Sequence, residues 1–423
     1  MYHTHPDPLE ARATGAPRPA DAAMNGRERH AALSLAGIFS LRMLGLFMIY
    51  PVFAVWARHL PGATPTTIGL ALGVYGLTQA LLQIPFGFLS DRLGRKRVIA
   101  AGLVLFAVGS VVAALAPTIH LIIFGRLLQG AGAIGSAVLA LAADLTRTQH
   151  RTKAMAIIGV TIGAAFAMAM VLGPVLDNWI GIRGIFWLTA VLAALGIAVL
   201  YGTVPREPAV RSEAPVEPAG RLFRSVLADP NLRRLNLGIF CLHAVLTASF
   251  LTIPFVLGDA GVALSRQWLA YLPVLLASVV LLVPLVIAAE RGRMRGVFLA
   301  MIALLGGAEI LLGVATHLVP VLGALLAFFT AFNVLESVLP SLLSRAAPPA
   351  AKGTAMGVYS SAQFLGIFVG GATGGLIKSA WGIAGVAGFC VALLAGWLIV
   401  AWLAEKPRHA LPGAVRGVDA EAR

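Results

Sequence analysis

The sequence predicts an all-α polytopic membrane protein with twelve transmembrane helices arranged as two pseudo-symmetric six-helix bundles. The composition is the first observation behind this prediction: 59% of the residues are hydrophobic and 12% are charged, whereas about a quarter of a soluble protein is charged. The mean hydropathy is +0.88. The second observation is that the apolar residues gather in long runs, and the third is that a short basic segment recurs after about 200 residues.

The apolar runs have the length of membrane spans. A helix needs roughly 20 apolar residues to cross the hydrocarbon core, because no backbone polar group can stay unpaired in lipid. Twelve runs meet this requirement, with approximate limits 31–57, 67–89, 98–116, 119–143, 154–176, 183–203, 234–257, 267–289, 296–316, 318–344, 353–377 and 381–404. The polar segment 1–30 is rich in Pro, Ala, Arg and His. We expect it to be a disordered tail, with a second tail at 405–423.

The positions of the cations predict the orientation. Of the 32 Lys and Arg residues, Arg42 and Arg126 lie within spans, and Arg58, Arg183, Arg266 and Lys378 lie in loops on one side. All the others lie in the tails or in loops on the opposite side. Because cationic loops stay in the cytoplasm, both termini are expected to be cytoplasmic. The formal charge of +14 therefore indicates topology and gives no reason to expect a nucleic-acid partner.

The chain divides into two similar parts. A polar linker at 204–232, which contains a short amphipathic stretch at 222–227, separates the bundles 31–203 and 233–404. The basic segment 87–97 (GFLSDRLGRKR) returns in weaker form at 290–295 (ERGRMR). Both occurrences have the same orientation, as expected of parallel repeats about an axis along the membrane normal. A substrate site between the two halves is the natural interpretation.

Several classes of chemistry find no support in the sequence. It contains no nucleophile with an adjoining base, no phosphate-binding glycine loop followed by Lys and Ser or Thr, and no Cys/His spacing typical of a metal site. We therefore expect neither an enzyme nor a cofactor or metal. Without a Walker motif, transport energy has to come from an ion gradient or from the gradient of the substrate itself.

Specific motifs resemble those of the major facilitator superfamily of secondary transporters. Residues 87–97 match its signature loop between spans two and three. The stretch 121–132, with Arg126, Gln129, Gly130 and Gly132, resembles the span-four motif of its proton-coupled members. Residues 163–174 resemble the span-five motif of drug:proton antiporters, but Asp177 and Asn178 replace that motif's closing glycines. The stretches 41–45 and 352–359 resemble the YajR-like branch. The resemblance covers about residues 31–404.

The resemblance implies transport by alternating access. We expect proton-coupled efflux of small amphipathic compounds by a monomer in the plasma membrane, which is the inner membrane if the organism is Gram-negative. Its partners would then be the substrate, protons and the lipid bilayer. A proton-coupled uptake symporter or a uniporter for a small metabolite is the alternative on the same fold. A membrane scaffold or sensor without transport is a more remote alternative.

Ionisable residues inside the spans are the candidate coupling residues, because charges in a bilayer are expensive. In the superfamily, spans one, four, seven and ten line the central cavity, so the resemblance implies one polar chamber. Its expected members are Arg42, Arg126, His243, Asn333, Glu336 and Gln79. Burial favours the proton-bound carboxyl group and a nearby cation favours the carboxylate, so a carboxylate can link proton release to conformation. A permanent ion pair or hydrogen bond within the bundle is the alternative for each charged residue.

The individual candidates differ in the role that they suit. Glu336 is the expected proton carrier, and His243 could relay protons or could be an ordinary core residue. Arg42 could hold a carboxylate or an anionic substrate, and the family motif implies a coupling role for Arg126. Glu309 lies in span nine, which the superfamily places at the periphery, so it is expected to face lipid with an unidentified partner.

The basic segment is also expected to act as a conformational latch. By resemblance, Arg95 pairs with Asp144, while Asp91 caps the N-terminus of span eleven in the other half. Both contacts are predicted only when the cytoplasmic side is closed. The predicted latch residues are Gly87, Asp91, Arg92, Gly94, Arg95, Arg97 and Asp144. Gly173 and Pro174 are the predicted bend used in transport.

Overall fold

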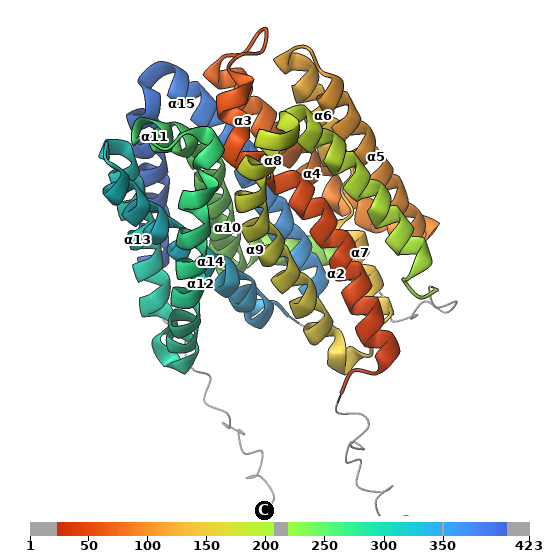
Figure 1. The fold of residues 1–423 in the computed structure, drawn as a ribbon. Coiled ribbons are helices and arrows are strands. Elements are labelled where there is room, and N and C mark those ends of the chain that lie inside the picture. Colours follow the sequence, from red (N-terminus) through yellow and green to blue (C-terminus); the bar gives the residue numbers. More distant parts are fainter. Residues whose placement is uncertain (1–22, 207–218, 349–350, 404–423) are drawn as a thin grey trace, which may run out of the picture.

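The computed structural model describes residues 23–206, 219–348 and 351–403. The first half contains α2 (Gly26–Phe47), α3 (Tyr50–Ala57), α4 (Pro65–Leu93), α5 (Arg95–Leu115), α6 (Ile119–Ala131), α7 (Gly135–Asp144) and α8 (Arg151–Gly202). The second half contains α9 (Ala219–Ala228), α10 (Pro230–Ser249), α11 (Ile253–Asp259), α12 (Trp268–Ala288), α13 (Met294–Val314), α14 (Leu318–Ala346) and α15 (Lys352–Trp402). The two groups of helices stand side by side (Figure 1).

The described helices account for every predicted span. In the described part of the chain, nine helical runs are long and apolar enough to cross a membrane. Three of these are 51 to 55 residues long, about twice the length that one crossing needs. Each contains a glycine with non-helical backbone, at Gly181, Gly292 and Gly382. Dividing the three runs at these turns gives helices that coincide with the predicted spans.

The first helix begins earlier than predicted. Asn25 and Glu28 form a reciprocal capping box, with the Asn25 side chain accepting from the Glu28 amide and the Glu28 carboxylate accepting from the Asn25 amide. This pairing satisfies amides that the start of a helix otherwise leaves free. Residues 26–30 are therefore helical and do not belong to the tail. Residues 1–22 and 404–423, and part of the predicted linker, 207–218, lie outside the described residues.

Glycine turns repeat in the two halves. Among the described residues, positive φ occurs at six glycines, which form three pairs about 200 residues apart: Gly62 with Gly261, Gly94 with Gly292, and Gly181 with Gly382. Side chains with a Cβ rarely adopt this conformation. Corresponding turns of the two halves therefore use the same backbone solution, which supports the repeat inferred from the sequence.

Spans one and seven break at corresponding places. The first helix of span one ends at Phe47 and the next begins at Tyr50, with Pro51 in its first turn. In span seven, α10 ends at Ser249 and α11 begins at Ile253, with Pro254 in its first turn. Proline is tolerated there because the first amides of a helix have no partner within the helix.

The basic segment 87–97 is almost entirely helical, so its description as a loop is wrong. Helix α4 continues to Leu93 and α5 starts at Arg95, with Gly94 alone between them at φ +101. A single glycine reverses the chain here. Its counterpart at Ala289–Arg293 forms a π-helical turn around Gly292.

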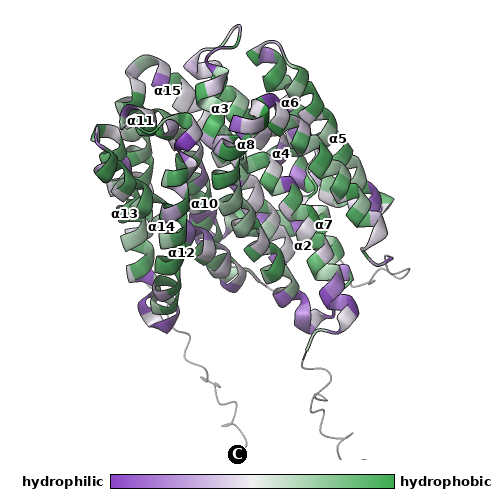
Figure 2. Ribbon diagram, viewed as in Figure 1, coloured by the Kyte–Doolittle hydropathy of each residue, from purple (hydrophilic) through white to green (hydrophobic). Residues whose placement is uncertain are grey.

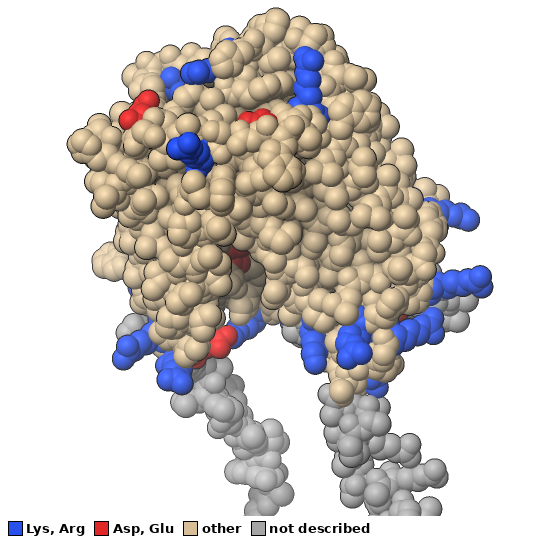
Figure 3. Space-filling view, viewed as in Figure 1, with Lys and Arg blue, Asp and Glu red and all other residues tan. Residues whose placement is uncertain are grey.

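Polar residues are concentrated at the ends of the helices, and apolar residues cover their length (Figure 2). Lys and Arg gather at one end of the molecule (Figure 3). We call this the basic end, which includes residues 87–97 and 290–295, and its counterpart the opposite end. The amphipathic helix α9 contacts α10 and α15, with Val226 buried, so it packs on the protein as well as presenting exposed apolar residues.

Candidate functional site

The two halves are in close contact toward the opposite end. Helix α4 lies against α15 so closely that a Cβ at Gly69 or Gly73 would meet backbone atoms around Gly371. A polar contact also crosses this seam, because the hydroxyl of Ser361 donates to the carbonyl of Ala80 at 3.2 Å. Toward the basic end, the space-filling view shows a hollow between the halves (Figure 3). The structure is therefore open at the basic end and closed at the opposite end.

Aromatic side chains from both halves meet across the centre of the seam. Phe166 of α8 stacks on Phe332 of α14 with ring centroids 5.6 Å apart. Tyr50 of α3 contacts Phe250 edge-on, also at 5.6 Å. Phe329 of α14 joins these groups through contacts with both Phe166 and Phe250. We call these five residues the aromatic layer. Such packing excludes water well, so the layer is a barrier within the seam.

A carboxyl group, an imidazole and an amide meet next to this layer. Glu336 follows Phe332 by one helical turn on α14, and its side chain is 36% exposed. Oε2 of Glu336 lies 3.8 Å from Nε2 of His243. The amide nitrogen of Gln363 lies 2.8 Å from Nε2 of His243 and 3.5 Å from Oε1 of Glu336. We call these three residues the acid cluster.

One arrangement of hydrogens satisfies the contacts of the acid cluster. Nδ1 of His243 lies 3.3 Å from the carbonyl of Ile239, a contact that requires the hydrogen on Nδ1. In a neutral imidazole Nε2 then accepts from the Gln363 amide and has no hydrogen to offer Glu336. Oε2 of Glu336 is buried and has no hydrogen-bond partner in the structure. Such an oxygen is costly as a bare anion, so it is a natural place for a proton.

Asn333 lies apart from the acid cluster. Its amide donates to the Ser278 hydroxyl at 3.1 Å, which connects α14 to α12 within the second half. This contact is of the kind that ties helices together.

Arg42 is fully buried within the first half. Its Nη2 donates to Oε1 of Gln79 at 2.8 Å and to the carbonyl of Gly132 at 3.1 Å. Gly132 lies in the break between α6 and α7, where the helical pattern of hydrogen bonds is interrupted. The guanidinium also lies over the rings of Tyr75 and Phe106, 5.6 and 5.2 Å from their centroids. Arg42 thus stabilises a broken helix.

Arg126 is also fully buried and also contacts Tyr75. Its guanidinium carbon is 5.0 Å from the Tyr75 ring centroid, and Nη1 donates to Oε1 of Gln129 at 2.7 Å. Nε donates to the carbonyl of Ala71 at 3.2 Å. We call Arg42, Arg126 and Tyr75 the arginine cluster. Two cations thus approach one ring, and cation–π attraction to that ring compensates part of their mutual repulsion.

Residues expected in the polar chamber form two hydrogen-bonded groups in this structure. Glu336 and His243 form the acid cluster in the second half, whereas Arg42, Arg126 and Gln79 form contacts within the first half. No hydrogen bond or ion pair between the two groups is present among the described residues. Both arginines make their hydrogen bonds within their own bundle, and the shared chamber stays a prediction.

The predicted latch is only partly formed. Arg95 pairs with Asp144 at 3.2 Å, as expected, but Asp91 pairs with Arg95 at 2.5 Å instead of reaching the other half. Helix α15 has no side-chain cap at its N-terminus. The expectation that both contacts form together is wrong, since the Arg95–Asp144 pair is present with the basic end open.

The other predicted latch residues lie around this pair. Arg92 and Arg97 are exposed, and a Cβ at Gly87 would lie 3.3 Å from the Ser136 hydroxyl. Gly94 supplies the turn between α4 and α5.

Gly173 and Pro174 lie inside the continuous part of α8, and the non-helical residue of that run is Gly181. A Cβ at Gly173 would meet the carbonyl of Met48, where span one is broken. Gly173 therefore permits close helix contact at that break.

Glu309 is buried and does not face lipid, so that expectation is wrong. Only 2% of the residue is exposed, and the Ser249 hydroxyl donates to its Oε1 at 2.5 Å. Cys390 lies 4.0 Å from the same hydroxyl. Its environment consists of α10, α13 and α15 within the second half, away from the acid cluster.

Sequence reasoning missed the aromatic layer. Phenylalanines in apolar spans are too common to suggest a barrier, and their contacts join spans far apart in the chain. Gln363 is conspicuous in the sequence as a polar amide in an apolar helix, which requires partners, but the sequence does not show that these partners are His243 and Glu336.

Comparison with known proteins gives a consistent result. Residues 35–283 match the family model of the Major Facilitator Superfamily. The chain is 46% identical over 391 residues to the inner membrane transport protein YajR of Escherichia coli strain K12, covering 92% of this chain and 86% of that protein. It is 34% identical to an uncharacterized transporter of Buchnera aphidicola subsp. Acyrthosiphon pisum, covering 82% and 90% of the two chains. A solved bacterial homologue of the human lysosomal transporter Spinster has a TM-score of 0.71 at 15% identity, covering 90% of this chain and 96% of that chain.

Proposed function

The chain belongs to the Major Facilitator Superfamily, and on that premise we propose that this membrane transporter couples proton entry to the efflux of small amphipathic compounds. Glu336 is the proton carrier in this proposal. The observation that supports this role is the position of Glu336 next to His243 and Gln363. Its side chain is 36% exposed, while its buried Oε2 has no hydrogen-bond partner in the structure. A carrier has to bind a proton in one conformation and lose it in another.

The hydrogen bonds of the acid cluster support a coupled change. When His243 accepts a proton at Nε2, that nitrogen becomes a donor and can no longer accept from the Gln363 amide. Its single hydrogen can then be donated to Glu336, whose Oε2 lies 3.8 Å away, and this favours the carboxylate. Proton movement between these residues thus changes the contacts between α10, α14 and α15, which carry them.

The seam supports alternating access. In this structure the aromatic layer and the glycine contacts between α4 and α15 separate the hollow from the opposite end. Transport then requires these contacts to open while the basic end closes. Since the aromatic layer has one member on α3 and one on α8, the proposed opening separates Tyr50 from Phe250 and Phe166 from Phe332.

The substrate proposal follows from the lining of the same region. Phe332 supplies an apolar ring, which also contacts His243 at 5.7 Å, and the acid cluster supplies a carboxyl group. A compound with an apolar body and a polar or cationic group matches both. Positively charged loops are retained in the cytoplasm, so we also propose that the basic end faces the cytoplasm and that efflux starts there.

The test is reconstitution of the full chain in liposomes that enclose a pH-sensitive dye. With an imposed proton gradient, addition of a transported amphipathic cation should change the internal pH faster than it does in protein-free liposomes. The assay is repeated with a panel of amphipathic compounds. If none of them causes proton movement, and none accumulates in response to the gradient, the proposal is contradicted. Uptake by symport is the alternative, and it predicts that substrate and protons move in the same direction in this assay.

A further inference from the structure

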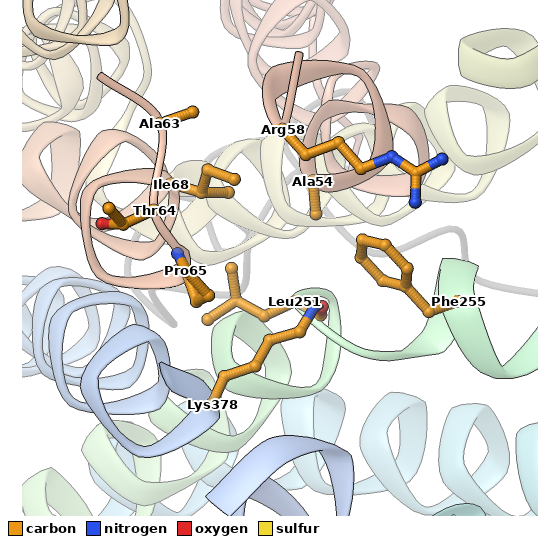
Figure 4. A pocket seen from close by; sticks show the side chains of 9 residues that line it. All are labelled: Ala54, Arg58, Ala63, Thr64, Pro65, Ile68, Leu251, Phe255 and Lys378. Carbon is orange, nitrogen blue, oxygen red and sulfur yellow. The ribbon is translucent and has the colours of Figure 1, made fainter. Parts of the chain in front are cut away.

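A pocket of about 220 Å³ lies at the opposite end, on the seam between the halves (Figure 4). Residues of the first half form one wall, and residues of the second half form the other. The lining residues are Ala54, Arg58, Ala63, Thr64, Pro65, Ile68, Leu251, Phe255 and Lys378. Because both halves contribute, the pocket exists only while they meet at this end.

Two cations border this pocket, one from each half. The Lys378 ammonium lies 3.6 Å from the centroid of the Phe255 ring, and it also donates to the carbonyl of Leu251. The guanidinium carbon of Arg58 lies 6.0 Å from the same centroid. The rest of the lining is almost entirely apolar, and none of the lining residues is acidic.

This concentration of charge is not explained by membrane topology. Cations are depleted on this side of the sequence, where only Arg58, Arg183, Arg266 and Lys378 occur, yet two of these four border one pocket. Like charges on separate halves oppose closure of the seam. The Phe255 ring compensates part of this repulsion, but a negative charge between the two cations would compensate it more completely.

We propose that this pocket binds a small organic carboxylate. Its apolar body lies against Ile68 and Leu251, and its carboxylate lies between Arg58 and Lys378 at the rim. Charge-assisted hydrogen bonds to both cations supply the specificity for an anion. Such a ligand contacts both halves, so it stabilises the conformation in which the opposite end is closed. The proposal rests on the geometry of this pocket and is independent of proton coupling and of transport direction.

The probe is sodium benzoate, which combines an apolar ring with a carboxylate. Thermal unfolding of the purified full chain in detergent is followed by tryptophan fluorescence, at constant ionic strength set with sodium chloride. Benzoate should raise Tm in a saturable manner, because a ligand that binds the folded state stabilises it. Benzamide, which has the same ring without the charge, should give no saturable rise. Equal effects of the two compounds, or no saturable effect of benzoate, would overturn the proposal.

Variants locate the binding. Lys378→Met and Arg58→Gln should each weaken the apparent affinity for benzoate by roughly tenfold, as expected for one lost charge-assisted contact. Arg266→Gln removes a cation from the same end outside the pocket, so it should leave the affinity unchanged. If Lys378→Met does not fold, the exposed Arg58 still gives the decisive variant. A benzoate effect that is unchanged in the folded pocket variants places the binding elsewhere and overturns the proposal.

Discussion

Nε2 of His243 lies 3.8 Å from Oε2 of Glu336, and the Gln363 amide contacts both side chains. Their helices, α10, α14 and α15, are separate parts of the second half. Any change in the protonation of this pair therefore changes contacts between three helices. The same region borders the aromatic layer through Phe332, which places the proposed proton carrier next to the barrier that has to open.

Replacing the proposed carrier should uncouple transport from protons. We expect Glu336→Gln to abolish proton movement in liposomes while substrate counterflow continues, because glutamine keeps the size but cannot release a proton. The matched control is Glu309→Gln, which replaces a buried carboxyl group outside the acid cluster. The folded fraction of this variant should keep its proton coupling. Unchanged coupling in Glu336→Gln would remove Glu336 as the carrier.

The two basic segments should contribute unequally to transport. Asp91 pairs with Arg95, whereas Glu290 lies exposed in the π-helical turn. We expect Asp91 to exchange Arg95 for the N-terminus of α15 when the basic end closes. Asp91→Asn is therefore expected to reduce the initial transport rate far more than Glu290→Gln. Transport assays at equal amounts of reconstituted protein compare the two. Equal losses would contradict an asymmetric latch.

The close packing between α4 and α15 leaves no room for an added methyl group at Gly371. A Cβ at Gly371 would meet the carbonyl of Gly69 and the backbone of Gly73. Gly371→Ala should lower the free energy of unfolding by about 1–3 kcal/mol, the usual cost of overpacking, and should disfavour closure of the opposite end. Gly388 lies beyond the turn at Gly382, and a Cβ there would have nothing within 4 Å, so Gly388→Ala is the control. Equal stability of the two variants by thermal unfolding would be inconsistent with the tight seam.

Arg42 is expected to act mainly through structure. Lysine cannot donate to both Gln79 and Gly132 in the same planar geometry, nor stack in the same way between Tyr75 and Phe106. Arg42→Lys should therefore destabilise the chain by about 2 kcal/mol in thermal unfolding. The exposed Arg345 gives the control, Arg345→Lys, which should be neutral. Full stability combined with lost transport would instead assign Arg42 a direct role in transport.

Much of the fold follows from local features of the chain. Span length depends on the thickness of the bilayer, so runs of apolar residues predicted each helix in the right place. The duplication was visible in the segments 87–97 and 290–295, and the paired glycine turns support it. Helix ends were less predictable. The start at Gly26 depends on the reciprocal bonds of Asn25 and Glu28, and the turn at Gly94 reduced an expected loop to one residue.

The sequence by itself determined that the chain is a transporter-like bundle and which buried ionisable residues were candidates, because the cost of a charge in lipid makes such residues conspicuous. Only the tertiary structure decided which of them meet. It turned Arg42 and Arg126 toward Tyr75 and brought His243, Glu336 and Gln363 together from three helices. It also buried Glu309 beside Ser249. The direction in which a side chain of a helix points depends on packing against segments that are distant in the sequence. The identity of one residue in one helix therefore does not reveal its partners.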